Sequence, residues 1–135
     1  MTIDSSAIVA IFMNEPECLF FQNQILAAET RIMSAVSLVE TGIVLEARLG
    51  AAVVRDLERY LDRLAIAVAA VDADLAWRAL TAWRKYGKGR HRARLNLGDC
   101  FSYALSQSTG EPLLAKGEDF ARTDLKLCPQ AGPAQ

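Results

Sequence analysis

Short apolar segments alternate with segments of helical period along most of this chain, and this alternation constrains its fold most strongly. Strand-like segments lie at 2–4, 30–34, 65–71 and 112–116, with a fifth candidate at 125–128. Segments with helical spacing of apolar residues lie between them, the clearest at 17–28, 37–49, 51–64, 73–86 and 96–107. Strands that are apolar throughout are typical of a parallel sheet covered on both faces. The sequence therefore predicts an α/β domain of three layers, with a mostly parallel central sheet of four to five strands between helices.

Length and composition predict a single compact domain. The chain has 135 residues, of which 52% are hydrophobic, enough to bury a core without disulfide bonds. We expect the domain to span residues 1–128 and the tail 129–135, which is Pro, Gly, Ala and Gln only, to be frayed. The longest apolar runs, 7–13 and 64–71, are far shorter than the ~20 residues that span a bilayer.

The expected location is a reducing cytoplasm, with no contact to a membrane. The first four residues contain an acid where a signal peptide would carry a cation. The three cysteines, Cys18, Cys100 and Cys128, are odd in number and widely spaced, which argues against a disulfide framework.

The charges are unevenly distributed, although the net charge is only -1. Residues 75–98 contain no acid and seven basic residues: Arg78, Arg84, Lys85, Lys88, Arg90, Arg92 and Arg94. A basic edge on an otherwise acidic body is suited to an anionic partner. The alternative interpretation is a solvated helix end and loop without a binding role.

Acidic residues from distant parts of the sequence are predicted to meet at one edge of the sheet. Asp4 directly follows the first strand, and Glu118 and Asp119 follow the strand at 112–116. Glu40 and Asp99 lie about three residues into helices, so their side chains point back toward the same edge. Ligands of open α/β sheets bind at this carboxyl edge. Carboxylates at close range repel one another unless a cation is present, and all-oxygen ligands favour Mg²⁺ or Mn²⁺.

Several of these acids have simpler explanations. Glu40 fits a capping box with Ser37, and Asp99 fits an acid that complements the dipole of its helix. Glu118 and Asp119 fit ordinary turn residues. Asp4 is the hardest to explain in this way, because it is a charge between apolar segments with only neighbouring serines as hydrogen-bond partners.

Other catalytic chemistries find little support. His91 is the only histidine and lies among arginines, so a Ser-His-Asp or Cys-His arrangement is not indicated. The cysteines lack zinc-ligand spacing, and the Gly-Lys-Gly-Arg segment at 87–90 is not part of a P-loop motif. Trp77 and Trp83, six residues apart on a helix, are interpreted as packing residues.

Four blocks of this sequence resemble PIN-domain proteins, in particular the VapC toxins of bacterial toxin–antitoxin pairs. The blocks are Asp4-Ser5-Ser6-Ala7-Ile8-Val9-Ala10-Ile11 with Glu15-Pro16-Glu17; Ser37-Leu38-Val39-Glu40 with Leu45-Glu46-Ala47-Arg48; Leu95-Asn96-Leu97-Gly98-Asp99-Cys100-Phe101-Ser102-Tyr103-Ala104-Leu105; and Pro112-Leu113-Leu114-Ala115-Lys116-Gly117-Glu118-Asp119-Phe120 with Thr123-Asp124. They occur in the family's order and spacing over residues 1–128.

The resemblance implies a three-layer PIN-like fold and a single-strand-directed endoribonuclease with a Mg²⁺ or Mn²⁺ site. Asp4, Glu40 and Asp99 match the family's acidic positions, and Ser6 matches a hydroxyl that supports the first acid. Many relatives place the fourth acid where this chain has Gly117. We favour Asp119 as the fourth acid here, with Glu118 as the alternative.

A mechanism and partners follow from this resemblance. Asp4 and Asp99 would hold an ion, and Glu40 or Asp119 would hold a second ion or orient the attacking water. Basic residues of the loop would grip the RNA backbone: Lys88, Arg90, Arg92 and Arg94. The implied partners are a VapB-type antitoxin and a second copy of the chain, in a homodimer or a larger hetero-oligomer.

Two other functions are kept open at this point. A PIN-like domain could bind RNA or a partner without cleaving. A receiver-like signalling domain would accept phosphate on an aspartate and sense it through Lys116, although such a domain carries an acidic pair after its first strand and this chain has only Asp4.

Overall fold

The computed structural model describes residues 1–129, so the proposed frayed tail lies, from residue 130 on, outside the described residues. The elements in chain order are β1 (Thr2–Ile3), α1 (Ser5–Phe12), α2 (Cys18–Ala27), β2 (Ile32–Ser34), α3 (Ala35–Leu49), α4 (Val53–Arg63), β3 (Ala67–Ala69), α5 (Ala73–Tyr86), α6 (Leu97–Thr109), β4 (Leu113–Leu114) and the 3₁₀ helix η1 (Phe120–Arg122). The predicted alternation of strands and helices is confirmed.

The four strands form one parallel sheet in the order β3-β2-β1-β4. Strands β2 and β3 are added in turn on one side of β1, and β4 is added on the other side. The strand order therefore reverses between β1 and β4, and a ligand crevice is expected beyond their carboxyl ends. The fifth candidate strand, at 125–128, adds only an isolated parallel bridge between Leu127 and Leu113.

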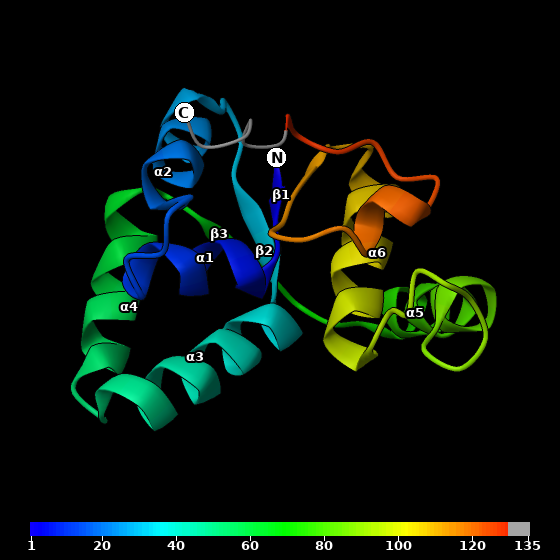
Figure 1. The fold of residues 1–135 in the computed structure, drawn as a ribbon, viewed down its shortest axis with the longest axis horizontal. Coiled ribbons are helices and arrows are strands. Elements are labelled where there is room, and N and C mark those ends of the chain that lie inside the picture. Colours follow the sequence, from blue (N-terminus) through cyan, green and yellow to red (C-terminus); the bar gives the residue numbers. More distant parts are fainter. Residues whose placement is uncertain (130–135) are drawn as a thin grey trace.

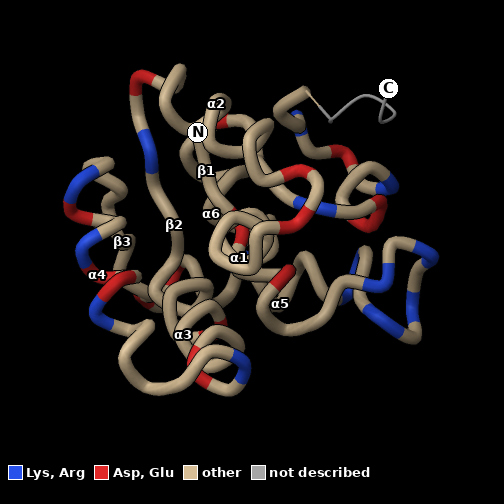
Figure 2. Tube along the Cα trace, turned by 60° about the vertical axis from the view of Figure 1, so that its left-hand side comes forward, with Lys and Arg blue, Asp and Glu red and all other residues tan. Residues whose placement is uncertain are grey.

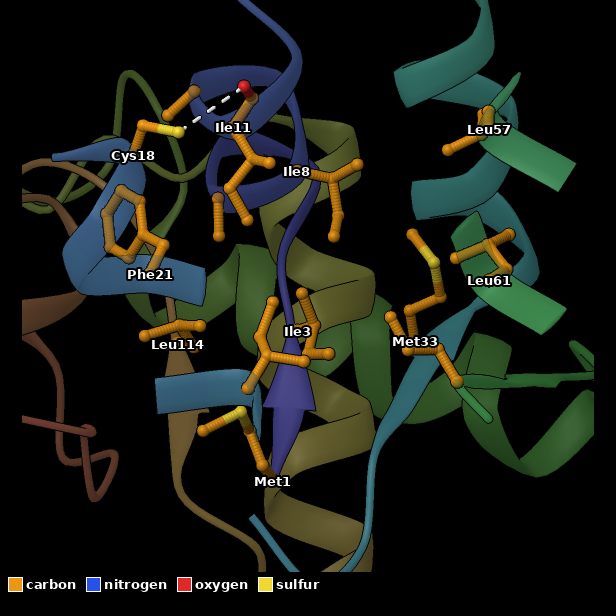
Figure 3. Packing of buried hydrophobic residues seen from close by; sticks show 14 of the residues in the cluster. Met1, Ile3, Ile8, Ile11, Cys18, Phe21, Met33, Leu57, Leu61 and Leu114 are labelled. Carbon is orange, nitrogen blue, oxygen red and sulfur yellow. Dashed lines mark hydrogen bonds between the residues drawn. The ribbon is translucent and has the colours of Figure 1, made fainter. Parts of the chain in front are cut away.

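Helices cover the sheet on both sides, which completes the predicted three-layer α/β/α architecture (Figure 1). Adjacent strand residues belong to separate cores, because successive side chains of a strand point to opposite faces. Leu114 and Met33 pack with α1, α2 and α4, whereas Leu113 and Ile32 pack with α5 and α6. Figure 3 shows the first core, where Ile3 of β1 lies among side chains from the helices.

Polar side chains cap four of the helices at their amino ends. Asp4 accepts a hydrogen bond from the Ser6 amide at the start of α1, and Asp72 accepts one from the Leu75 amide at the start of α5. Asn96 caps α6. The start of α3 differs from the sequence interpretation: the capping residue is Ser34, not Ser37, so the capping box with Glu40 does not form. Glu40 therefore lies in the second turn, where its carboxylate is available for other contacts.

Two predictions of burial are wrong. The apolar segment 65–71 was expected to form a strand covered on both faces, but β3 is an edge strand and Val68 and Val71 are exposed. Trp77 and Trp83 of α5 were interpreted as packing residues, yet both side chains are exposed. Within residues 1–129, no helix has the length and apolar character needed to span a bilayer.

Candidate active site

Asp4 is a buried carboxylate at the carboxyl end of β1, with 3% of its surface exposed. Its Oδ2 accepts hydrogen bonds from the Ser6 amide at 3.1 Å and the Ser6 hydroxyl at 2.7 Å, and its Oδ1 accepts one from the Ser102 hydroxyl at 2.5 Å. Ser6 Oγ also accepts from the Lys116 amide at 2.9 Å, which ties the segment after β4 to the first block. The carboxylate is thus held in one orientation by groups from three parts of the chain.

A chain of buried, hydrogen-bonded hydroxyl groups ends at the Asp4 carboxylate, and it was not predicted from the sequence. Ser34 Oγ donates to Ser37 Oγ at 3.2 Å, and Ser37 Oγ lies 3.1 Å from Ser102 Oγ, which donates to Asp4. All three serines are buried. Because every hydroxyl can point its hydrogen toward the carboxylate, each bond polarises the next. The available signal was the placement of small polar residues at core positions of α3 and α6.

Glu40 lies between the starts of α1 and α6. The Ser5 hydroxyl donates to Glu40 Oε1. On the other side, the backbone of Gly98 approaches so closely that a Cβ atom at residue 98 would lie 2.3 Å from Glu40 Oε2. A side chain at residue 98 would therefore displace the Glu40 carboxylate from its position. Gly98 places Glu40 beside the first turn of α6, which carries Asp99.

Asp99 combines a structural and an electrostatic role. Its Oδ2 accepts from the Asn96 amide at 3.0 Å and the Asn96 side chain accepts from the Asp99 amide at 2.9 Å, so the two form a capping box. The pKa of Asp99 is raised to about 7, mainly by burial and also by the negative charges of Asp4, Glu40 and Asp119, while the Asn96 hydrogen bond opposes the rise. Asp4, Glu40 and Asp119 are therefore all close enough for their charges to act on Asp99.

Asp119, at the start of η1, is the third acid whose negative charge raises the pKa of Asp99. This coupling supports Asp119 as the fourth acid of the site, the choice favoured from the sequence. Lys116, three residues before Asp119, forms ion pairs with Glu15 and with Glu17, the latter at 3.2 Å. These pairs hold the segment after β4 against the loop between α1 and α2.

The carboxylate oxygens of this site suit a hard divalent cation, although the side chains are not yet arranged as a complete set of ligands. All four candidates are carboxylates, and their mutual repulsion would be relieved by a cation. Within residues 1–129, no three acidic, histidine or cysteine side chains are arranged to hold a metal ion as they stand. Binding would therefore require side-chain rotations that bring other carboxylates toward that of Asp4, which is held by its hydrogen bonds.

The basic loop, residues 87–95, connects α5 to α6 and is exposed at Lys88, Arg90, Arg92 and Arg94. Figure 2 shows this loop as a segment with blue and no red, on the opposite side of α6 from the helices of the first core. His91 is not placed for catalysis, because its Nδ1 accepts from the Ala93 amide at 3.0 Å and its ring packs edge-on against Tyr86. The three cysteines are buried, and burial raises the pKa of Cys100 to about 11, so it is a poor nucleophile.

Comparison with known proteins supports the relationship that the geometry suggests. The family model of the PIN domain matches residues 1–126. Ribonuclease VapC30 of Mycobacterium tuberculosis (strain ATCC 25618 / H37Rv) is 50% identical over 125 residues, which cover 93% of this chain and 95% of the relative. Ribonuclease VapC of Mycolicibacterium smegmatis is also 50% identical over 125 residues, with 93% of this chain and 97% of the relative covered.

Solved structures share the fold. The crystal structure of VapC20 of Mycobacterium tuberculosis, described as a sarcin-ricin loop cleaving toxin, has a TM-score of 0.73 at 21% identity and covers 92% of this chain and 95% of that one. A toxin-antitoxin complex from Klebsiella pneumoniae contains a chain with a TM-score of 0.69 at 17% identity, with 96% and 97% covered. At these identities the likeness concerns the fold alone.

The fold, the acidic edge and these matches define a PIN domain. The chain belongs to the PIN-domain family and, within it, to the VapC proteins. The receiver-like hypothesis is therefore wrong. The residue it needed as a phosphate sensor, Lys116, is instead ion-paired with Glu15 and Glu17.

Proposed function

We propose that this protein is a Mg²⁺- or Mn²⁺-dependent endoribonuclease, the toxin of a toxin–antitoxin pair. The observation that carries the proposal is the position of Glu40 between two other acids: its carboxylate accepts from Ser5, the residue after Asp4, and contacts Gly98, the residue before Asp99. The negative charges of Asp4, Glu40 and Asp119 also raise the pKa of Asp99. The ribonuclease names of relatives that are 50% identical support the reaction and the substrate class. We place its activity in the cytoplasm.

Asp4 and Asp99 would hold the ion, Asp4 because its orientation is fixed and Asp99 because its charge is otherwise costly. When bound, the ion supplies a Lewis acid for the scissile phosphate and a water of lowered pKa. Glu40, oriented by Ser5 and Gly98, and Asp119 would hold a second ion or accept the proton of the attacking water. The thiols and the histidine have no part in the reaction.

The basic loop would bind the phosphates on either side of the scissile bond. Lys88, Arg92 and Arg94 are exposed there and can contact phosphates without reading bases. Affinity for RNA should therefore fall steeply with salt. Selection among RNA sequences would need further contacts to unpaired bases.

An antitoxin segment would bind across an apolar groove next to the acids. The groove, about 510 Å³ in volume, is lined by residues of α3 and the start of α6, including Glu40 and Gly98. Val39, Ile43 and Leu97 are exposed there. A segment with apolar side chains and one basic side chain would fit this groove, because the basic group could reach the carboxylates. A homodimer is also proposed, and sedimentation of the isolated chain tests it.

The proposal is tested by purifying the chain alone and incubating it with total cellular RNA and Mg²⁺ or Mn²⁺. Metal-dependent cleavage should be abolished by Asp99→Asn and by excess EDTA. Asp74→Asn is the matched control, because Asp74 is an exposed acid on α5 paired with Arg78 and remote in role from the site. Retention of full activity by Asp99→Asn would contradict the proposal. RNA binding without cleavage by the wild type would favour the non-cleaving alternative.

A further inference from the structure

The exposed face of α5 carries both tryptophans of the chain. Trp77 is 68% exposed and Trp83 is 39% exposed. Leu80 lies three residues from each tryptophan and is a neighbour of both along the helix, and Arg84 lies four residues after Leu80. We name Trp77, Leu80, Trp83 and Arg84, with Arg90 above them, the tryptophan face. Large aromatic side chains left exposed together usually mark a binding surface.

Trp83 is held in a fixed orientation. The Arg90 guanidinium lies over its ring, 4.8 Å from the centroid, and Arg90 is anchored by a 3.2 Å hydrogen bond from its Nε to the Arg84 carbonyl. The Gly87 backbone also lies against the ring, because a Cβ atom at residue 87 would clash with Trp83 Cδ1. Trp83 is therefore an ordered part of this face, covered by Arg90, and not a mobile side chain.

The surroundings of this face are cationic. No acid occurs from residue 75 to residue 98, and the loop that begins at the end of α5 adds Lys88, Arg92 and Arg94 (Figure 2). The acid of the helix start, Asp74, is already paired with Arg78 at 2.8 Å. A second copy of the chain would bring like charges against this face. An anionic ligand with flat rings is complementary to it instead.

The loop that joins α5 to α6 connects the tryptophan face to the helix that carries Asp99. The Leu95 amide donates to the Tyr86 carbonyl at 3.0 Å, and the Lys88 amide donates to the Leu95 carbonyl at 2.9 Å, so the loop is closed at its base. Trp83 lies one helical turn before this closure and Asp99 lies four residues after it. Chain reach therefore limits their separation to roughly 25 Å, so one bound strand can contact both.

We propose that the tryptophan face binds single-stranded RNA by stacking unpaired bases on Trp77 and on the Arg90 guanidinium that covers Trp83, while other basic residues of the face and loop hold the phosphates. The inference rests on the proposed ribonuclease function. It adds a binding surface for the part of the RNA strand next to the cleavage point. Basic surfaces with exposed aromatic side chains bind single strands in this way, with a large contribution per stacked base. Duplex RNA, whose bases are already stacked, would gain nothing from the tryptophans.

Intrinsic fluorescence tests the proposal directly, because the chain has only these two tryptophans. The full chain carrying Asp99→Asn, which prevents cleavage, is titrated with a short single-stranded RNA and separately with inorganic polyphosphate, which has charge but no bases. RNA should quench the tryptophan emission strongly. Adding Trp77→Ala should weaken RNA binding by at least about fivefold and leave polyphosphate binding unchanged.

Leu19→Ala is the matched control, since Leu19 is an equally exposed apolar side chain on α2, and it should change neither affinity. RNA binding that neither quenches the emission nor depends on Trp77 overturns this inference and leaves the proposed function standing. If the wild type neither cleaves nor binds RNA, both fail. If Trp77→Ala changes only the sedimentation of the chain, the face joins two copies and the inference is wrong.

Discussion

Gly98 and Glu40 are in such close contact that the glycine defines where the glutamate can lie. A Cβ atom at residue 98 would lie 2.3 Å from Glu40 Oε2 and 2.8 Å from its carboxyl carbon. The contact joins the second turn of α3 to the first turn of α6. Residue 98 therefore controls the position of one acid and immediately precedes another, Asp99.

We expect Gly98→Ala to reduce RNA cleavage by at least about tenfold while leaving the fold intact. The added methyl group displaces a flexible side-chain end, which costs little stability, and alanine is the better helix former by up to about 1 kcal/mol. The measurements are initial cleavage rate and thermal midpoint. Gly42→Ala in α3 is the matched control, since a Cβ atom there meets nothing within 4 Å. Equal activity of the two variants would contradict the expected displacement.

Ser102→Ala should lower both stability and activity. The change removes the hydroxyl that donates to Asp4 at 2.5 Å and leaves Ser37 without its link to the carboxylate. Buried polar groups that lose a partner cost about 1 to 3 kcal/mol. Urea unfolding gives the stability, and cleavage assayed far below the midpoint gives the activity. The control is Ser108→Ala, at an exposed position of the same helix, which should change neither stability nor activity. If Ser102→Ala also changes neither, the hydroxyl chain does not position Asp4.

Asp99 should make the metal-free protein less stable as the pH rises. Its pKa is raised from 3.8 to about 7 in the folded chain, so losing the proton favours the unfolded state. The penalty is absent below pH 3.8, grows between pH 3.8 and 7, and is complete above pH 7. Asp99→Asn should therefore stabilise the protein at pH 8 by on the order of 2 kcal/mol and have little effect at pH 4. The free energy of unfolding of both proteins is measured by urea unfolding in EDTA at pH 4 and pH 8. If Asp99→Asn changes it equally at the two pH values, the prediction is wrong.

Mg²⁺ or Mn²⁺ should raise the thermal midpoint of the wild type, because a ligand that binds only the folded state stabilises it. Asp119→Asn should reduce this increase, whereas Glu118→Gln should not, because the charge of Asp119 acts on the pKa of Asp99. Metal binding at pH 6 should also release a proton from Asp99, measurable by calorimetry in two buffers. The reverse ranking of the two variants would make Glu118 the fourth acid.

The strand-helix alternation and three of the acids could be predicted because they depend on local patterns. Helix α5 begins and ends at the predicted residues, as Asp72 and Gly87 mark its limits. Glu118 and Asp119 could not be separated from the sequence, because adjacent residues in a turn have the same local signals. The charge of Asp119 acts on the pKa of Asp99, which is a tertiary relationship that no local signal shows.

The errors came from contacts between distant segments. The apolar run at 65–71 predicted a strand, yet nothing local indicates that β3 lies at the edge of the sheet with Val68 exposed. Ser37 looked like a helix cap, but Ser34 takes that place and frees Ser37 for the contact with Ser102. The tryptophans of α5 looked like packing residues because apolar side chains usually are.

The sequence by itself determined the class of fold, the acidic positions and the basic loop, because periodicity, helix caps and charge are properties of short segments. The tertiary structure alone decided which atoms meet. The hydroxyl chain from Ser34 to Asp4, the close approach of Gly98 to Glu40 and the ordered ring of Trp83 each join groups whose spacing along the chain carries no signal. Hydrogen bonds and repulsion act within a few ångströms, so they depend on folding to bring those groups together.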